Sequence, residues 1–564
     1  MGKLRLAMAQ IDSVVGDLAG NTACIVSHVQ KARSLGADVI AFPELAICGY
    51  PPEDLLHKPR FVEENLQALD AVIKASQGIT VIVGYVDSRE GLRNAAAIIH
   101  NGSLIDSYHK IFLPNYGVFD ENRYFLPGNR CPVYTICGFQ LGVNICEDIW
   151  FTSGPSTAQA NKGAELIINI SASPYHFGKR NQREKMLSDR ALENRVYIAY
   201  TNMVGGQDEL VFDGASDVFD YNGNLLIRGK QFQEDMVVLD LDIPVLPRQA
   251  DTNVPDSIFV SSAGFETLKP PIENIAFTPL ETDAEVYQAL LLGTRDYINK
   301  NGFKKVVIGL SGGIDSSLVA TIAADALGPE NVVGVIMPSR YSSEGSISDS
   351  LHLAGNLGIK TLQIPIDPLF QSFLNTLSDV FAGTEANTTE ENIQARIRGN
   401  LLMALSNKFH WLVLNTSNKS ETAIGYSTLY GDMAGGFAII KDVPKVLVYR
   451  LVHNRNKLAG FDLIPNNVLA KPPSAELKPN QLDTDSLPPY EVLDPILEAY
   501  VEQDKSIDQI VVLGFAADIV KRVVKMVDRS EYKRRQAPPG IKITPKAFGR
   551  DRRLPITNRY NHAN

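Results

Sequence analysis

Hydrophobic residues follow two different patterns along the chain. In the first part, short apolar runs predict strands at residues 4–10, 39–42, 80–86, 141–145 and 166–170. Asn101-Gly102, between apolar runs, predicts a hairpin over residues 95–107, and the turn at 221–224 predicts a second one. Helical periodicity appears over 21–35 and 183–195. Hairpins together with helices favour an α/β sandwich built from mixed sheets.

The second part alternates helices with strands. We expect helices at 287–299 and 317–327, and strands at 305–310, 332–337, 360–364 and 411–415. Residues 495–525 are also predicted to be helical. Because this alternation builds βαβ units, it favours a doubly wound, Rossmann-like parallel sheet.

A proline-rich polar segment separates the two patterns. Periodicity fades there, and prolines recur at 247, 255, 270, 271 and 279. We therefore expect a first domain over residues 1–245, a linker over 246–283 and a second domain over 284–564.

Composition narrows the class of protein. The 564 residues contain 54 Lys and Arg against 64 Asp and Glu, a net charge of −10, which argues against nucleic acid as a partner. Neither an apolar run of about 18 residues nor a signal-peptide pattern is seen, so we expect no membrane partner and a cytoplasmic location. The five cysteines contain no Cys-x-x-Cys pair, which disfavours a disulfide framework or a zinc site.

A glycine-rich loop follows the strand predicted at 305–310. It reads Ser311-Gly312-Gly313-Ile314-Asp315-Ser316-Ser317 and opens the next helix. Glycines let backbone N–H groups approach an anion, and a helix N-terminus adds partial positive charge, so the loop is predicted to bind phosphate. It lacks the Gly-Lys-[Ser/Thr] of a Walker A loop and the G-x-G-x-x-G of a dinucleotide fold, which disfavours kinases and dehydrogenases.

This loop resembles the PP-loop of the N-type ATP pyrophosphatases, which cleave ATP between its α and β phosphates. The resemblance implies that ATP is a cosubstrate and that Mg²⁺ is the cofactor, held by Asp315. The segment Asn415 to Glu421 with Tyr430-Gly431-Asp432 is similar to the NAD synthetase pattern. In that pattern Thr416 and Lys445 would bind ATP. Glu421 would be the second magnesium ligand and also a contact of deamido-NAD, together with Asp432.

Basic residues crowd the C-terminal part of the chain. Eight cations fall within residues 531–553: Lys533, Arg534, Arg535, Lys542, Lys546, Arg550, Arg552 and Arg553. They are either a solvated basic segment or a set of unpaired cations that bind the deamido-NAD pyrophosphate, with Lys533 and Lys546 as candidates. Arg396 is a further candidate for this substrate, although a surface salt bridge would explain it equally well.

In the first part, Cys146 stands where an apolar strand meets the charged pair Glu147-Asp148. A thiol at a strand end can attack a substrate if a base and an oxyanion partner lie nearby, whereas most cysteines in apolar surroundings are inert. Glu44 and Lys110 also follow predicted strands, and they could serve as that base and that partner.

These three segments, in this order, resemble the carbon-nitrogen hydrolase (nitrilase) superfamily and imply its α-β-β-α sandwich. The resemblance makes Cys146 the nucleophile, Glu44 the base, Lys110 the third member of the triad and Glu121 an auxiliary glutamate. The candidate contacts for glutamine are Tyr116, Ser173, Lys179 and Arg180.

An amidase joined to an adenylating synthetase is chemically consistent, because ammonia released from glutamine can attack an adenylated carboxylate. The pairing resembles the glutamine-dependent NAD synthetases and implies a ligase that converts deamido-NAD, ATP and glutamine to NAD⁺, AMP, pyrophosphate and glutamate. Two alternatives remain: amidation of a different acid, or an ammonia-fed synthetase carrying a non-catalytic interaction module. We expect only small-molecule substrates as partners, and a homo-oligomer.

Overall fold

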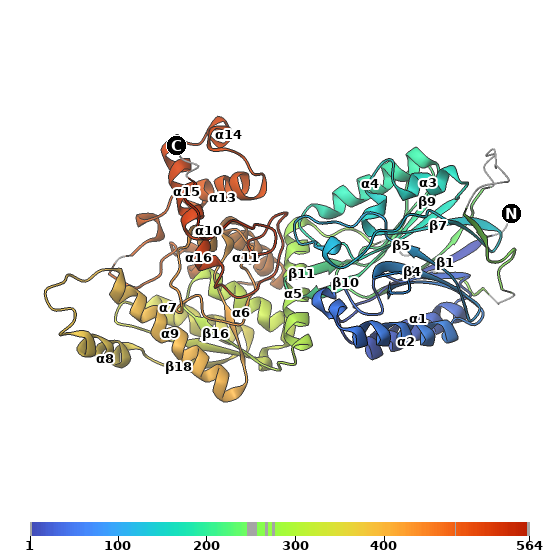
Figure 1. The fold of residues 1–564 in the computed structure, drawn as a ribbon. Helices are drawn as coiled ribbons and strands as arrows, with labels where there is room; N and C mark the ends of the chain where they lie inside the picture. The colour runs from blue at the N-terminus through green and yellow to red at the C-terminus, as the bar shows by residue number, and fades with distance from the viewer. Residues whose placement is uncertain (1–2, 245–255, 266–268, 273–276, 480, 561–564) are drawn as a thin grey trace. The chain divides into compact units, whose positions relative to one another are not determined.

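The computed structural model describes residues 3–244, 256–265, 269–272, 277–479 and 481–560 (Figure 1). Its contacts define two compact units. The first comprises residues 1–207 and 211–280, and the second comprises residues 208–210 and 281–564.

Two sheets form the first unit. The six-stranded sheet has the order β14 (Asp235–Leu241), β1 (Leu4–Gln10), β2 (Val39–Ala41), β3 (Thr80–Asp87), β4 (Arg93–His100) and β5 (Ser103–His109). The seven-stranded sheet has the order β13 (Leu225–Arg228), β12 (Asp217–Phe219), β9 (Tyr197–Asn202), β8 (Leu166–Ser171), β7 (Phe139–Ile145), β6 (Val133–Ile136) and β15 (Ser257–Phe259). Parallel and antiparallel pairs occur in both, as the hairpin signals predicted.

The two predicted hairpins are present. β4 pairs antiparallel with β5 across Asn101 and Gly102, whose φ angles of 47° and 83° suit a tight turn. The turn at 221–224 joins β12 to β13. Strands β10 (Val204–Gln207) and β11 (Leu210–Asp213) form a further, two-stranded sheet.

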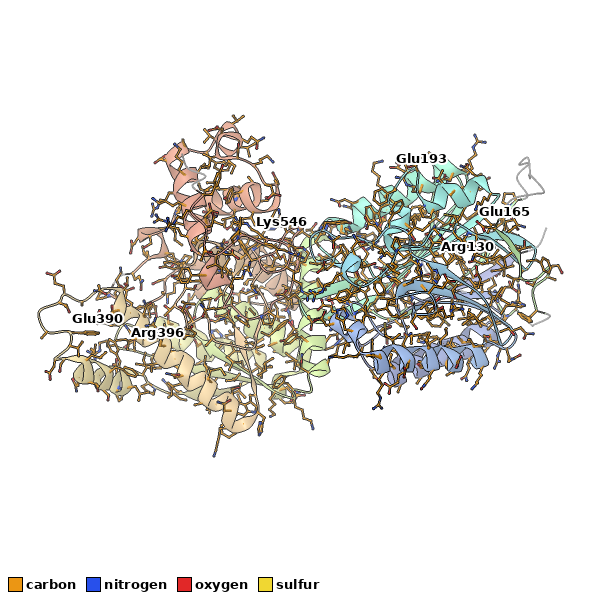
Figure 2. All side chains as sticks on the ribbon, viewed as in Figure 1. Arg130, Glu165, Glu193, Glu390, Arg396 and Lys546 are labelled. Atoms are coloured by element: carbon orange, nitrogen blue, oxygen red, sulfur yellow. The ribbon has the colours of Figure 1, made fainter. Side chains whose placement is uncertain are left out.

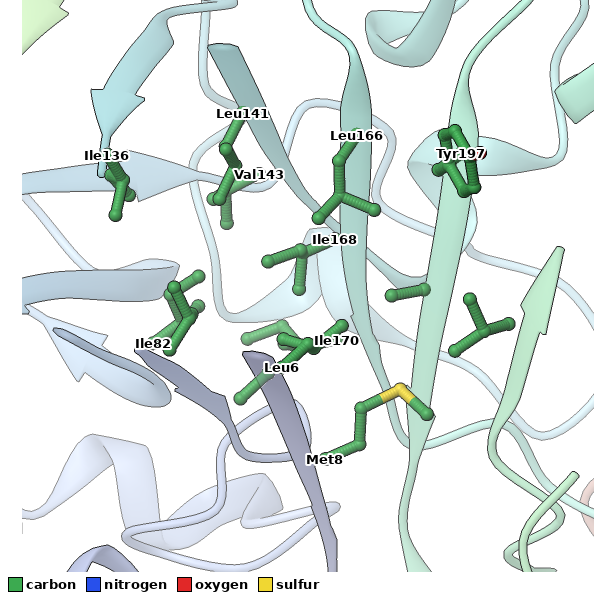
Figure 3. Packing of buried hydrophobic residues seen from close by; sticks show 14 of the residues in the cluster. Leu6, Met8, Ile82, Ile136, Leu141, Val143, Leu166, Ile168, Ile170 and Tyr197 are labelled. Atoms are coloured by element: carbon green, nitrogen blue, oxygen red, sulfur yellow. The ribbon is translucent and has the colours of Figure 1, made fainter. Parts of the chain in front are cut away.

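The main core of the first unit lies between its two sheets. Figure 3 shows Leu6, Met8 and Ile82 of one sheet among side chains of the other, such as Val143 and Ile168. Helices α1 (Leu18–Ser34) and α2 (Pro59–Ala75) cover the outer face of the first sheet, and α3 (Pro155–Asn161) and α4 (Lys179–Asn194) cover that of the second. The α-β-β-α sandwich is confirmed.

The segment predicted to be a linker also contributes to this sandwich. Its strand β15 pairs in parallel with β6, with Ser257 opposite Val133. A three-residue strand among prolines leaves no periodic signal, so only pairing with a distant partner reveals it. The domain boundaries taken from the sequence stay a prediction.

The second unit is built on a parallel sheet with the order β18 (Lys360–Gln363), β17 (Val332–Ile336), β16 (Val306–Leu310), β19 (Leu412–Asn415) and β20 (Phe437–Ala438). The chain moves outward in both directions from β16 and β19, which confirms the doubly wound sheet. Ligands of such sheets bind where the strand order reverses, beyond the carboxyl ends of the strands. That point lies beside the loop 311–317.

The helices of this unit are α5 (Thr282–Lys300), α6 (Ile314–Leu327), α7 (Glu344–Leu357), α8 (Asp367–Leu377), α9 (Thr388–Phe409), α10 (Lys419–Ile424), α11 (Lys445–Ala459) and α12 (Asn466–Ala470). The helical prediction over 495–525 is confirmed for most of these residues, but they do not form a single helix. The chain instead forms α13 (Tyr490–Leu497), a π-helical turn, α14 (Ile507–Val512), α15 (Ala517–Arg529) and α16 (Glu531–Arg534). Positive φ angles at Asp504 and Gly514 break the helix between these segments.

Across the described part of the chain, every helix is too short or too polar to cross a membrane.

Candidate active sites

A buried cluster of a lysine and two glutamates lies in the first unit. Lys110, directly after β5, donates from Nζ to Glu44 Oε1 at 2.6 Å and to Glu121 Oε1 at 2.8 Å. The three side chains are at most 6% exposed. Because the charges are shielded from water, one cation holds both carboxyl groups in a fixed arrangement.

Further hydrogen bonds hold the two glutamates in place. Asn94 Nδ2 donates to Glu44 Oε1 at 2.7 Å, and the backbone N–H of Ala172 donates to Glu44 Oε2 at 3.0 Å. Tyr50 donates its hydroxyl to Glu121 Oε1 at 2.9 Å. Each glutamate is thus oriented by groups from other segments of the chain, as reacting groups require.

Cys146 begins a 3-10 helix immediately after β7. Its φ angle of 44° is left-handed, which costs free energy for a residue that is not glycine. Burial and then the nearby Glu44 raise the pKa of the thiol well above its ordinary value, whereas Lys110 lowers it. The structure therefore brings Cys146, Glu44 and Lys110 together.

Two other pKa shifts describe the charge state of the cluster. Burial alone would lower the pKa of Lys110, but Glu121 and Glu44 raise it well above its usual range, so the ammonium keeps its proton. Burial raises the pKa of Glu121 to about 7, against the opposing effect of Lys110. The cluster thus retains one firm positive charge beside the thiol.

The predicted glutamine contacts differ in their surroundings. Tyr116 donates its hydroxyl to both Glu147 carboxylate oxygens at 3.1 Å, and Lys179 Nζ lies 4.4 Å from the centre of the Trp150 ring. Burial lowers the pKa of Lys179, an effect opposed by the charges of Cys146 and Glu147. These residues therefore lie near the thiol. Sequence reasoning missed Glu147, although it adjoins the cysteine in the chain.

Ser173 and Arg180 are held by protein groups. The backbone N–H of Ser173 donates to Asn202 Oδ1 at 3.1 Å, and Ser173 is buried. Arg180 instead forms an ion pair with Glu184 at 3.0 Å along α4.

In the second unit, the loop 311–317 forms the predicted turn between β16 and α6. Gly312 has a φ angle of 73°, and a Cβ atom there would lie 2.6 Å from Ser346 Cα, so only glycine fits. Ser316 and Ser317 donate their hydroxyls to Gly313 O at 3.0 and 2.8 Å. The loop is held in one shape at the start of a helix, as an anion site requires.

Asp315 and Glu421 meet at Lys445. The Lys445 ammonium donates to Asp315 Oδ2 and lies 3.4 Å from Glu421 Oε1, and Asn418 Nδ2 donates to Asp315 Oδ1 at 2.9 Å. Burial raises the pKa of Glu421 to about 8, although Lys445 opposes the shift. The segment 415–421 thus lies beside the loop as predicted, with Thr416 at the end of β19.

The residues predicted to contact deamido-NAD lie in different parts of the second unit. Asp432 Oδ1 accepts from the backbone N–H of Thr428 at 2.8 Å, and burial raises the Asp432 pKa to about 6. Lys533 lines a small cavity at the end of β19 and donates to the carbonyls of Gly425 and Ser427, each at 2.7 Å. Figure 2 shows Arg396, on α9, well apart from Lys546 within this unit.

Five of the eight C-terminal cations are paired, so the expectation of unpaired cations is wrong for these five, and Arg534, Lys542 and Arg552 are buried rather than solvated. Ion pairs within the unit are Lys542 with Asp551 at 2.5 Å, Lys546 with Asp504 at 2.5 Å, Arg534 with Glu531 at 2.8 Å, Arg535 with Glu531 at 2.9 Å and Arg552 with Asp528 at 3.4 Å. Counting charge along the chain misses partners such as Asp504, which folding brings close.

Another feature that sequence reasoning missed joins this segment to α10. The buried Lys419 donates to Asp442 Oδ1 at 2.9 Å, to Glu502 Oε1 at 2.7 Å and to Thr544 Oγ1 at 2.6 Å. It stands between Asn418 and Glu421, so the C-terminal segment supports the helix that carries Glu421. No local pattern distinguishes such a lysine from an exposed one.

Two family models match the two parts of the chain. The carbon-nitrogen hydrolase family model matches residues 5–248, and the NAD synthase model matches residues 286–537. The chain is 49% identical to the glutamine-dependent NAD(+) synthetase of Thermotoga maritima, over 99% of each chain. It is 47% identical to that of Aquifex aeolicus, over 99% of this chain and 100% of the relative.

A solved structure adds to this agreement. The glutamine-dependent NAD⁺ synthetase from Acinetobacter baumannii, in complex with adenosine diphosphate, matches with a TM-score of 0.76 at 40% identity, over 99% of each chain. Full-length identity of this extent, together with both family models, establishes the relationship: the chain belongs to the glutamine-dependent NAD(+) synthetase family.

Proposed function

We propose that this chain is an ATP-dependent ligase that makes NAD⁺ from deamido-NAD with nitrogen taken from glutamine. The proposal rests on two sites held by one chain. The first is the buried Glu44–Lys110–Glu121 cluster beside Cys146. The second is the glycine-rich loop 311–317, which contains Asp315 and lies beside the segment of Glu421. We assign the hydrolase to residues 1–245 and the synthetase to residues 284–564, joined by 246–283. The two matched family ranges support this division.

In the hydrolase, Glu44 takes the proton of the Cys146 thiol as the sulfur attacks the amide carbon of glutamine. The Lys110 ammonium stabilises the oxyanion that forms, since its neighbours hold its proton firmly. Glu44 then returns the proton to the leaving nitrogen, and ammonia departs. Water, deprotonated by Glu44, cleaves the thioester to give glutamate and the free thiol. Tyr116, Ser173, Lys179 and Arg180 are the proposed contacts that orient glutamine.

In the synthetase, the carboxylate of deamido-NAD attacks the α-phosphorus of ATP, and pyrophosphate leaves. The backbone of Gly312 and Gly313, with the hydroxyls of Ser311, Ser316 and Ser317, surrounds the phosphates, while Lys445 and Thr416 contact them from the facing segment. Ammonia then attacks the carbonyl of the acyl-adenylate, and AMP departs to leave the amide of NAD⁺.

Magnesium fits the carboxylates of this site. Mg²⁺ usually binds one or two carboxylates together with substrate phosphates. Among the described residues, no group of three or more His, Cys, Asp or Glu side chains could hold a metal ion. The Glu421 side chain is 19% exposed, and its raised pKa means that the carboxylate would gain from a further cation. Asp315 and Glu421 would hold the ion, which would neutralise charge on the departing pyrophosphate.

For deamido-NAD we propose Asp432 and Lys533 as the principal contacts, because both lie near the end of β19. Arg396 donates to Leu429 O at 3.2 Å and Lys546 pairs with Asp504, so each, like Lys533, would have to exchange a partner to bind substrate. Lys533 comes first because it lines the cavity at that strand end, together with Asn415. We also propose that the enzyme works in the cytoplasm, where ATP and glutamine are available. Light scattering would test whether it is a homo-oligomer, a state favoured by the exposed Leu369 and Phe373 of α8.

The test compares nitrogen donors. Cys146→Ala should abolish NAD⁺ formation with glutamine and spare it with high ammonium, because only the hydrolase loses its nucleophile. Equal loss with both donors would refute two separate sites. The acid substrate is tested by AMP release with ATP, Mg²⁺ and ammonium plus deamido-NAD, xanthosine monophosphate or aspartate. AMP formation with either of the last two, but not with deamido-NAD, would refute the proposed product.

A further inference from the structure

One buried carboxylate links the segments that carry the two reacting groups of the hydrolase. Asp148 Oδ1 accepts the backbone N–H groups of Ile111 at 3.1 Å and Phe112 at 2.9 Å. Ile111 directly follows Lys110, so this oxygen fixes the chain at the point where it leaves the lysine. The Asp148 side chain is fully buried, and water cannot replace these bonds.

The second oxygen of Asp148 holds the segment of the cysteine. Asp148 Oδ2 accepts the backbone N–H of Ile145 at 3.2 Å and the hydroxyl of Tyr108 at 2.8 Å. Ile145 directly precedes Cys146 and belongs to β7, whereas Tyr108 belongs to β5 in the other sheet. The carboxylate therefore joins the two sheets of the sandwich at the hydrolase site.

We propose that Asp148 is a positioning residue that holds Cys146 and Lys110 at their reacting separation. The proposal rests on the hydrolase function proposed above. The left-handed turn at Cys146 is unfavourable by itself, so surrounding contacts must hold it. The hydrogen bond from Ile145 N to Asp148 is one such contact, because Ile145 directly precedes Cys146. Asp148 touches neither reacting atom in our scheme, so its effect passes through the backbone.

The variant Asp148→Asn separates this role from simple packing. Asparagine has the same shape but offers one acceptor oxygen and one N–H₂ group, so it cannot accept from both backbone segments. A displacement of about 1 Å between reacting groups costs about 100-fold in rate. We expect glutaminase kcat to fall about 100-fold with little change in the KM for glutamine. Alkylation of Cys146 by iodoacetamide should slow in parallel, while ammonium-driven synthesis persists.

Asp38→Asn is the matched control. Asp38 is also a buried carboxylate of the first unit, and it accepts from Arg5 N at 2.7 Å and from Lys269 Nζ at 2.6 Å, away from the cluster. This variant should lose stability to a similar degree and keep the kcat and alkylation rate of the parent. A purely structural role for Asp148 would make the two variants behave alike.

Tyr108→Phe gives a second variant in case Asp148→Asn does not fold. It removes one of the four bonds, so kcat and the alkylation rate should fall between those of the parent and those expected for Asp148→Asn. If the variant that folds keeps the kcat and the alkylation rate of the parent, Asp148 has no positioning role. Cys146→Ala distinguishes failure of the positioning role from failure of the proposed function. Glutaminase activity retained in Cys146→Ala would mean that Cys146 is not the nucleophile.

Discussion

Replacing Lys110 by methionine should destabilise the first unit in a way that depends on pH. The change keeps an unbranched, slightly shorter side chain but leaves Glu44 and Glu121 facing each other without their cation. Breaking a buried ion pair by removing one partner costs about 3–5 kcal/mol, because the remaining charge is uncompensated. We expect a loss of that size at pH 8.

The pH dependence follows from the pKa of Glu121. Burial raises this pKa from 4.5 to about 7 while Lys110 opposes the shift, so removing the lysine should raise it above 7. A carboxyl whose folded pKa exceeds its unfolded pKa favours folding at low pH, and this contribution is lost as pH rises through the folded value. In the parent that loss ends near pH 7. In the variant it continues above pH 7, at about 1.4 kcal/mol per pH unit.

Tryptophan fluorescence can follow the first unit alone. The chain has two tryptophans, Trp150 in the first unit and Trp411 in the second, so a Trp411→Phe background leaves one reporter. Urea unfolding at pH 6, 7 and 8 gives the stability difference between variant and parent. Lys162→Met is the control, because Lys162 pairs with the partly exposed Asp256 at 3.2 Å and should cost at most about 1 kcal/mol.

Two results would refute this reasoning. A loss below about 1 kcal/mol at pH 8 would mean that Lys110 does not compensate the buried carboxylates. A loss of full size that stays constant from pH 7 to pH 8 would mean that Glu121 does not take up the proton.

Two other predictions concern the second unit. Gly312→Ala should abolish synthesis with either nitrogen donor while glutamine hydrolysis continues, because the new Cβ would lie 2.6 Å from Ser346 Cα; normal AMP release would contradict the loop assignment. Lys533→Met should raise the KM for deamido-NAD more than that for ATP, whereas Lys546→Met should change it less, because Lys533 lines the cavity at the end of β19 and Lys546 instead pairs with Asp504. The opposite order in steady-state kinetics would place the substrate nearer the C-terminal segment.

Local sequence was sufficient where neighbours along the chain supply the physical cause. Short apolar runs predicted β1, β3 and β16, because burial of a strand acts on a few neighbouring residues. The turn at Asn101-Gly102 and the loop at Gly312 were predictable because only certain residues tolerate positive φ angles. The strand-end positions of Glu44, Lys110 and Cys146 followed from the same reasoning, and their motifs pointed to the chemistry.

Tertiary structure decided the features whose partners lie far along the chain. The edge strand β15 exists through pairing with β6, over 120 residues away in the chain, and the C-terminal cations find carboxylates such as Asp504 and Asp528. The role proposed for Asp148 likewise depends on donors at residues 108–112, which the sequence places about 40 residues away. Burial and distance between remote segments set these charges and bonds, and neither quantity is encoded in a local window of residues.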